Sequence, residues 1–259
     1  MSDFDPDALI EDFDPDAFIA AQTPSVPTLS AQARPARVPL SYAQERLFFL
    51  YQLEPESVAY HITTAIRVRG ALDVEAFERA LNGVIARHES LRTTFRLTAG
   101  NAEQVVHEKL PVAIEQLEGA YQEKPFDFLH GPLVRCAVRR LGRNDAGQNE
   151  HEVYLSMHHI VSDGWSLGVF WRELSALYNG EGLPPLAVQY ADYALWQREH
   201  VKLDAQEAYW KQKLAGAPAA LELPTDRPRP AVMSHRGAVH AFAIEKAETI
   251  NALSRTEGV

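Results

Sequence analysis

Two adjacent histidines just ahead of an Asp-Gly dipeptide are the residues of this sequence best suited to chemistry. The stretch MHHIVSDGWS contains His158 and His159, followed by Asp163 and Gly164. A histidine titrates near neutral pH, so it can accept or share a proton under physiological conditions. Gly164 allows a backbone to approach a ligand closely, and a helix behind it would direct N–H groups and a partial positive charge toward the same point. The pattern favours a catalytic site over the alternative, a pair of structural histidines.

The residues EVYLSMHH are typical of a β-strand that ends at the histidines. Consecutive side chains of a strand point to opposite faces, so we expect one histidine to face a site and the other to pack. Opposed faces argue against a metal site, in which several ligands converge at about 2 Å from the ion. We therefore expect no metal.

Other candidate nucleophiles are weaker than the histidines. Ser162 and Ser166, close in sequence to His159 and Asp163, suggest a Ser-His-Asp hydrolase. The nucleophilic serine of such enzymes usually lies in a Gly-x-Ser-x-Gly turn, however, and the sequence has no such run. The single cysteine, Cys136, lies beside Arg135 within a predicted strand, so we expect it to be buried rather than nucleophilic.

Composition limits the classes of partner. The 259 residues are 46% hydrophobic and 23% charged, which is enough for a sizeable core. A formal net charge of -10 argues against nucleic acid or an anionic membrane as the main partner, because binding phosphates requires clustered Lys and Arg. One cysteine cannot form an internal disulfide, and no apolar run has membrane-spanning length. These features favour a cytoplasmic protein.

Helical and strand periods alternate along the chain after residue 37. Ser41 and Asp73 are predicted N-caps of two helices, and SLRTTFRL and EQVVHE are expected to form a hairpin around Ala99, Gly100 and Asn101. The remaining predictions are strands over residues 60–70, 131–141 and 151–159 and helices over residues 166–178 and 190–216. Intermixed elements with antiparallel pairs predict a two-layer α/β or α+β sandwich.

The N-terminus carries a short tandem repeat that the rest of the chain does not share. DFDPDALI begins at Asp3 and DFDPDAFI at Asp12, and a segment rich in Pro, Ala and Ser follows. We expect residues 1–37 to be an acidic repeat and flexible linker, and residues 38–259 to be the folded part. The repeat is either a solvated acidic tail or a peptide that docks onto another protein.

The histidine motif resembles the His-His-x-x-x-Asp-Gly signature of nonribosomal peptide synthetase condensation domains. Further stretches are similar to other motifs of that family, in the family's order: SYAQERLFFL, RHESLRTTF, KPFDFLHGPLVR, YADYALW and DRPRPAVMSHRGA. The resemblance covers roughly residues 38–259. Because several ordered motifs match, it is much more specific than the histidine motif alone.

The resemblance implies a chloramphenicol-acetyltransferase-like lobe with a mixed sheet and flanking helices. In the family, two lobes enclose a tunnel in which an acceptor amine attacks a donor thioester. The partners implied are donor and acceptor peptidyl carrier proteins, whose phosphopantetheine carries the substrates, so no cofactor would be bound directly. Residues 1–22 are a candidate contact to an upstream synthetase.

The resemblance also implies roles for individual residues. His159 would be the active-site residue, and His158 would shape the strand from behind. Asp163 would be structural and paired with Arg87 or, as the second choice, Arg92. Gly164 would be where the backbone meets the acceptor amine. Together with Arg87 and Arg92, we expect Trp165 to support the site structurally.

The family pattern leaves two further expectations. Family members continue beyond LSRTEGV into a second lobe, so we expect this chain to be one N-terminal lobe that is inactive by itself. The L-donor, L-acceptor subtype is preferred because SYAQERLFFL and HHIVSDGWSLGV resemble it. The alternatives are an acyltransferase of the same superfamily that uses CoA thioesters and a non-catalytic lobe that only binds a carrier protein.

Overall fold

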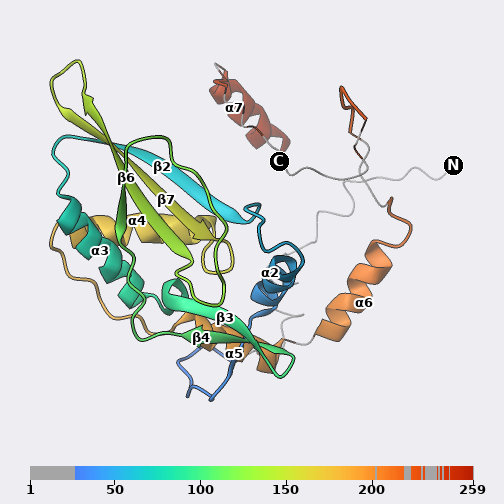
Figure 1. The fold of residues 1–259 in the computed structure, drawn as a ribbon. Coiled ribbons are helices and arrows are strands. Elements are labelled where there is room, and N and C mark those ends of the chain that lie inside the picture. The colour runs from blue at the N-terminus through green and yellow to red at the C-terminus, as the bar shows by residue number, and fades with distance from the viewer. Residues whose placement is uncertain are drawn as a thin grey trace. The chain divides into compact units, whose positions relative to one another are not determined.

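A computed structural model describes residues 27–201, 203–218, 223–228, 230, 238, 240, 242–244 and 246–258. The acidic repeat, and with it the proposed docking segment at residues 1–22, lies outside the described residues. The chain divides into two compact units, Met1–Leu214 and Ala215–Val259. All the residues of the histidine motif belong to the first unit (Figure 1).

A four-stranded sheet forms the centre of the first unit. Its order is β2-β7-β6-β5, and all neighbours are antiparallel except β5 and β6, so the sheet is mixed as predicted. Gly70, which follows β2, has a φ of +104°, a conformation that glycine adopts more readily than other residues. The strands are β2 (His61–Arg69), β5 (Ile114–Leu117), β6 (Val134–Arg143) and β7 (Asn149–His158).

Two helices pack along one side of this sheet (Figure 1). They are α3 (Val74–Arg87), whose predicted cap Asp73 accepts a hydrogen bond from the Ala76 N–H, and α4 (Gly164–Tyr178). Their apolar faces form one hydrophobic core with alternate residues of the central strands. The core members include Leu81, Val84, Phe170, Leu174, Val138, Val153, Leu155 and Met157.

A smaller, three-stranded sheet has the order β1-β4-β3. The hairpin of β3 (Thr93–Thr98) and β4 (Asn101–Val106) turns at Ala99 and Gly100, both at positive φ, which confirms the predicted turn. The edge strand β1 (Val38–Pro39) leads into α2 (Tyr42–Leu53), and η2 (Glu89–Arg92), a short 3-10 helix, leads from α3 into β3. The predicted cap Ser41 forms a capping box with Gln44.

The single helix predicted for residues 190–216 is wrong. The structure has two helices there, α5 (Tyr190–His200) and α6 (Leu203–Lys213). Val201 ends α5 in extended backbone, with its N–H donating to the Gln197 carbonyl at 3.0 Å. A β-branched residue is slightly less favourable in a helix than at such an extended position, but Val84 and Ile85 inside α3 show that this preference alone does not end a helix.

The second unit has one described helix, α7 (Ala247–Glu257), whose apolar Ile250 and Leu253 are exposed. Over the described ranges of both units, the structure contains no helix that combines the length and the apolar character needed to cross a membrane.

Candidate active site

The two histidines of the motif have opposite environments, as the alternation of a strand predicts. His158 is the last residue of β7 and is 5% exposed, whereas His159 follows it and its side chain is exposed. The His159 N–H donates to the Tyr60 carbonyl at 2.8 Å, which fixes its backbone against the start of β2. In the part of the chain that the structure describes, no protein group hydrogen-bonds to the His159 imidazole. Its ring nitrogens are therefore available for hydrogen bonding to another molecule.

His158 is held as a neutral imidazole. Its Nδ1 accepts a hydrogen bond from the Ile160 N–H at 3.0 Å, and its ring packs edge-on against Phe128 at 4.6 Å between centroids. Burial, together with the charges of His61 and His159, lowers the pKa of His158 to about 3. A ring that is buried and neutral can orient the end of β7 but cannot take a proton at physiological pH.

A cluster of polar side chains around Glu123 lies next to His158. Glu123 lies 2.8 Å from His61 Nδ1 and accepts hydrogen bonds from Thr63 at 2.8 Å and Ser156 at 2.9 Å. Burial alone would raise the pKa of Glu123, but its hydrogen bonds with His61, Thr63 and Ser156 lower it. The cluster joins β2 to β7 next to His158, and sequence reasoning missed it because Glu123 lies in an irregular segment.

Asp163 caps α4 and does not pair with Arg87 or Arg92, so the expected ion pair is wrong. Asp163 Oδ1 accepts from the Ser166 N–H at 2.7 Å and from the Ser166 hydroxyl at 2.6 Å. These two hydrogen bonds hold the pKa of Asp163 below its usual value, with a smaller contribution from the charge of His159. The cap also explains why α4 begins at Gly164, two residues before the predicted start.

Arg87 has a different partner, which sequence reasoning missed. Its Nε lies 3.1 Å from Glu173 Oε2, and His88 Nε2 lies 2.6 Å from the same oxygen. Glu173 is 8% exposed and sits between Phe170 and Leu174 on the buried stripe of α4. A carboxylate in an apolar stripe needs a cationic or hydrogen-bonding partner, and that position was the signal available in the sequence.

Arg92 hydrogen-bonds to backbone carbonyls and not to residues of the histidine motif. Its guanidinium donates to the carbonyls of Ala86, at 3.3 Å, and His107, and it lies 3.8 Å from Glu89. It therefore ties η2 to the end of β4. These contacts of Arg92 are not predicted from the sequence.

Trp165 does not support the core, because its side chain is 86% exposed. It is the second residue of α4 and lines the rim of a cavity described below. Gly164, beside it, has no atom within 4 Å of the place where a Cβ would be. The backbone at the start of α4 is therefore open to approach by another molecule.

His159 lines a pocket of about 210 Å³ at the start of α4. The pocket brings together the end of β7, the start of α4 and residues of α2 and α5. Tyr190, from α5, also donates or accepts a 2.9 Å hydrogen bond with Ser41. The polar and charged residues of the lining are Arg46, Ser90, His159, Ser162, Asp163, Ser166 and Tyr190. An imidazole that lines such a pocket is suited to hydrogen-bonding an amine or an oxyanion.

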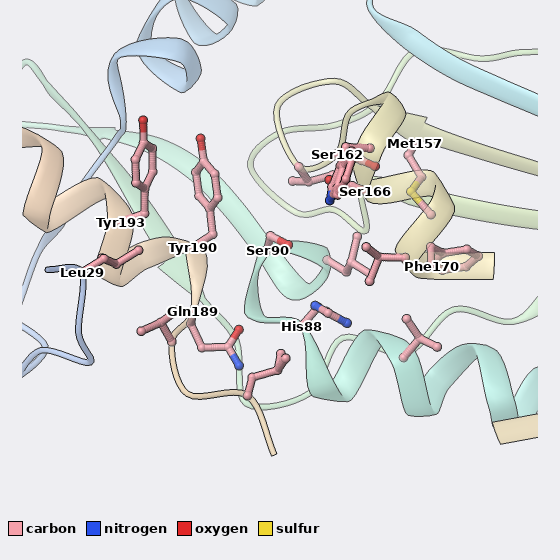
Figure 2. A pocket seen from close by; sticks show the side chains of 17 residues that line it. Leu29, His88, Ser90, Met157, Ser162, Ser166, Phe170, Gln189, Tyr190 and Tyr193 are labelled. Atoms are coloured by element: carbon pink, nitrogen blue, oxygen red, sulfur yellow. The ribbon is translucent and has the colours of Figure 1, made fainter. Parts of the chain in front are cut away.

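A second, larger cavity adjoins this pocket (Figure 2). Its volume is about 360 Å³, and it lies among α3, α4 and α5. Figure 2 shows Tyr190 and Tyr193 on one side and Ser162, Ser166 and Phe170 on the other. Among the described residues, no group of three or more His, Cys, Asp or Glu side chains is arranged to hold a metal ion at either place.

The mixed sheet, its two helices and the histidine motif define a chloramphenicol-acetyltransferase-like lobe, and residues 35–258 match the family described as Condensation domain. The chain belongs to the condensation domain family. A linear gramicidin synthase from Brevibacillus parabrevis contains a matching stretch that is 42% identical over 253 residues, covering 87% of this chain and 3% of that protein. Malpibaldin synthetase of Mortierella alpina is 42% identical over 246 residues, covering 85% of this chain and 4% of that protein. The chain therefore spans only a small part of the length of these relatives.

Two solved structures are similar as well. The X-domain in the complex with OxyB from teicoplanin biosynthesis is 35% identical, with a TM-score of 0.67 over 81% of this chain and 50% of that chain. The condensation domain of the monacolin K polyketide synthase MokA is 26% identical, with a TM-score of 0.59 over 74% of this chain and 46% of that chain. The chain thus spans about half of each solved chain.

Proposed function

We propose that this chain supplies the active-site histidine for peptide-bond formation between two carrier-bound thioesters in nonribosomal peptide synthesis, in the cytoplasm. The observation that carries the proposal is the exposed His159 imidazole in a pocket at the start of α4, next to open backbone at Gly164. Membership of the condensation domain family and 42% identity to part of a linear gramicidin synthase support it.

The reaction forms one bond and breaks another. The acceptor amine attacks the donor carbonyl carbon, a C–N bond forms, the C–S bond breaks, and the amine proton ends on the departing thiolate. A thioester is already activated, so holding the two ends together supplies much of the rate, about 7–11 kcal/mol for well-oriented reactants. His159 either takes the proton from the amine or hydrogen-bonds it in the attacking orientation.

The neighbouring residues have supporting roles in this proposal. Asp163 holds the start of α4 in place through its cap, and Gly164, which carries no side chain, leaves room for the acceptor amine next to the backbone at the start of the helix. His158, neutral and buried, fixes the end of β7 so that His159 faces the pocket. The chain acts here as one N-terminal lobe, and a second lobe provides the opposite wall.

Substrates and partners are part of the same proposal. Donor and acceptor peptidyl carrier proteins deliver the thioesters on phosphopantetheine, and the donor residue and acceptor residue both have the L configuration. Residues 1–22 contact an upstream synthetase through their acidic side chains. Deleting residues 1–22 is expected to slow transfer from the upstream carrier, more so at low salt than at high salt.

The test joins the chain to a second lobe and measures product from two loaded carriers by mass spectrometry. His159→Ala should lower the rate by about a hundredfold or more, whereas His159→Gln should retain part of the rate if the imidazole only positions the amine. Unchanged product formation in His159→Ala would refute the proposal. Turnover of acyl-CoA, with no need for a loaded carrier, would point to the CoA-dependent alternative, and a D-configured donor used in preference would exclude the L-donor subtype.

A further inference from the structure

We propose that the 360 Å³ cavity next to the His159 pocket binds an uncharged, apolar aminoacyl side chain, and that Leu29 forms one of its walls. The identity of the ligand rests on the function proposed above. Leu29 precedes the residues that match the family, which begin at residue 35, so this wall comes from a segment outside the matched region.

The lining selects apolar ligands. Val84, Met157, Val169, Phe170, Leu186 and Val188 present hydrocarbon to the cavity. None of the residues that line it is Asp, Glu, Lys or Arg. A charged side chain would lose its hydration here without gaining a partner charge, so its binding is disfavoured.

The polar side chains of the lining are largely committed to other contacts. His88 hydrogen-bonds to Glu173 at 2.6 Å, and Gln189 accepts from the Glu89 N–H and donates to the Arg87 carbonyl, both at 3.0 Å. Their polar groups are therefore already paired within the protein and offer a ligand little charged or polar recognition. The volume is near the lower end of the range of ligand pockets, about 300–1,000 Å³, and suits a single side chain better than a long acyl chain.

The cavity shares part of its lining with the pocket of His159. Ser90, Val161, Ser162, Ser166 and Tyr190 line both. In Figure 2 Ser162 and Ser166 lie at the edge of the cavity opposite Tyr190. An aminoacyl group whose reacting atoms lie at His159 can therefore place its side chain in the apolar cavity. The geometry thus links this cavity to the reacting groups.

Leu29 is held against the cavity by contacts on both sides of it in the chain. The Pro27 carbonyl accepts from Trp196 Nε1 at 2.6 Å, and the Gln32 N–H donates to Asp192 Oδ1 at 3.1 Å. Arg34 adds an ion pair to the buried Asp192, at 3.2 Å. Leu29 is half-buried, and Figure 2 shows it on the same side of the cavity as Tyr193. Residues 27–34 therefore form a strap over α5 that closes one end of the cavity.

The test measures binding, so that it is independent of amide formation. The 259-residue chain carrying His159→Ala is titrated with the N-acetylcysteamine thioesters of leucine and of aspartate, and the affinity is followed by calorimetry and by amide chemical shifts. We expect the leucyl thioester to bind at least about tenfold more tightly than the aspartyl thioester and to shift the amides of Val169 and Tyr193. Because both thioesters are compared on the same His159→Ala background, the difference between their affinities reports the cavity and not the reacting groups at His159.

Leu29→Ala should weaken binding of the leucyl thioester by about tenfold, because the wall that excludes water is lost. Trp196→Phe, which removes the hydrogen bond to Pro27 but keeps an aromatic ring, should weaken it by a smaller factor. The matched control is Leu97→Ala, which removes a half-exposed leucine from the β3–β4 hairpin and should change nothing. Melting temperatures of all three variants establish that they are folded.

The outcomes separate this inference from the proposed function. Equal binding of the two thioesters, no saturable binding, or shifts that avoid Val169 and Tyr193 would overturn the cavity assignment. Tight leucyl binding that Leu29→Ala leaves unchanged would overturn the role of the strap. A reconstituted enzyme that forms no amide bond, while this chain still binds the leucyl thioester in the cavity, would refute the proposed function without removing the binding site.

Discussion

The guanidinium of Arg87 at the end of α3 is joined to the carboxylate of Glu173 on α4 by a 3.1 Å ion pair. Both side chains are largely shielded from water, and His88 adds a second hydrogen bond to the same carboxylate oxygen. The pair fixes the spacing between the two helices that cover the central sheet. It therefore sets the position of α4, whose first turn lies next to His159.

Replacing Glu173 by Gln is expected to destabilise the first unit. The amide keeps the size of the side chain but removes the charge that compensates Arg87, and a hydrogen bond to a charged group contributes about 1.5–3 kcal/mol. Urea denaturation followed by circular dichroism should give a loss in the free energy of unfolding of about that size. A variant as stable as the parent chain would contradict the role of this ion pair.

Asp163 provides a contrasting prediction, because it acts as a helix cap. Asp163→Ala removes both hydrogen bonds to Ser166 and should lower the free energy of unfolding by about 1 kcal/mol. Asp163→Asn retains an oxygen that can accept from the Ser166 N–H and should lose much less. If Asp163 were instead the partner of Arg87, Asn would be nearly as harmful as Ala, and the two variants would give similar unfolding curves.

The local elements are largely predictable from sequence because their signals are local. Ser41 and Asp73 cap the helices that they are predicted to cap, and Ala99 and Gly100 form the predicted turn. The opposite environments of His158 and His159 follow from the period of a strand. The break at Val201 escapes prediction because the sequence remains helical in character on both sides of it.

Contacts between distant elements cannot be predicted in the same way. Arg87 and Glu173 are 86 residues apart, and choosing among the carboxylates for Arg87 requires knowing how α3 lies on α4. A cation is the natural partner to expect for Asp163, but the Ser166 N–H, three residues along the chain, is enough to satisfy it. The strap at residues 27–34 is expected as linker because its composition carries no helical or strand period.

Cys136 is expected to be unreactive in the folded chain. It is 4% exposed, and burial, with a smaller contribution from the charge of Glu78, raises the pKa of its thiol to about 12. Because the thiolate is the reactive form, the thiol should be almost entirely unreactive at about pH 8. Dithionitrobenzoate should therefore release one equivalent of chromophore in denaturant and almost none without it. Rapid release from the native chain would show that β6 opens readily.

The buried His158 makes the stability of the chain sensitive to acid. Its pKa is lowered to about 3 in the folded chain, whereas an unperturbed histidine titrates near about pH 6.5. Between those values the unfolded chain binds a proton at this residue and the folded chain does not. The free energy of unfolding must then fall as the pH falls, with a slope of about 1.4 kcal/mol per pH unit from this residue alone.

His158→Gln removes that proton-binding difference while keeping a neutral polar side chain of similar reach. We expect the variant to be less stable than the parent chain at about pH 8, because the ring contact with Phe128 is lost, and to lose less stability between about pH 6.5 and about pH 4.5. Carboxylates such as Asp163 and Glu123 are present in both proteins, so their contribution to the pH dependence is shared and the difference in slope reports His158. Urea denaturation at several pH values measures the difference in slope between the two proteins. Parallel pH dependences would mean that His158 is protonated in the folded chain, and its role as a neutral support behind His159 would then have to be abandoned.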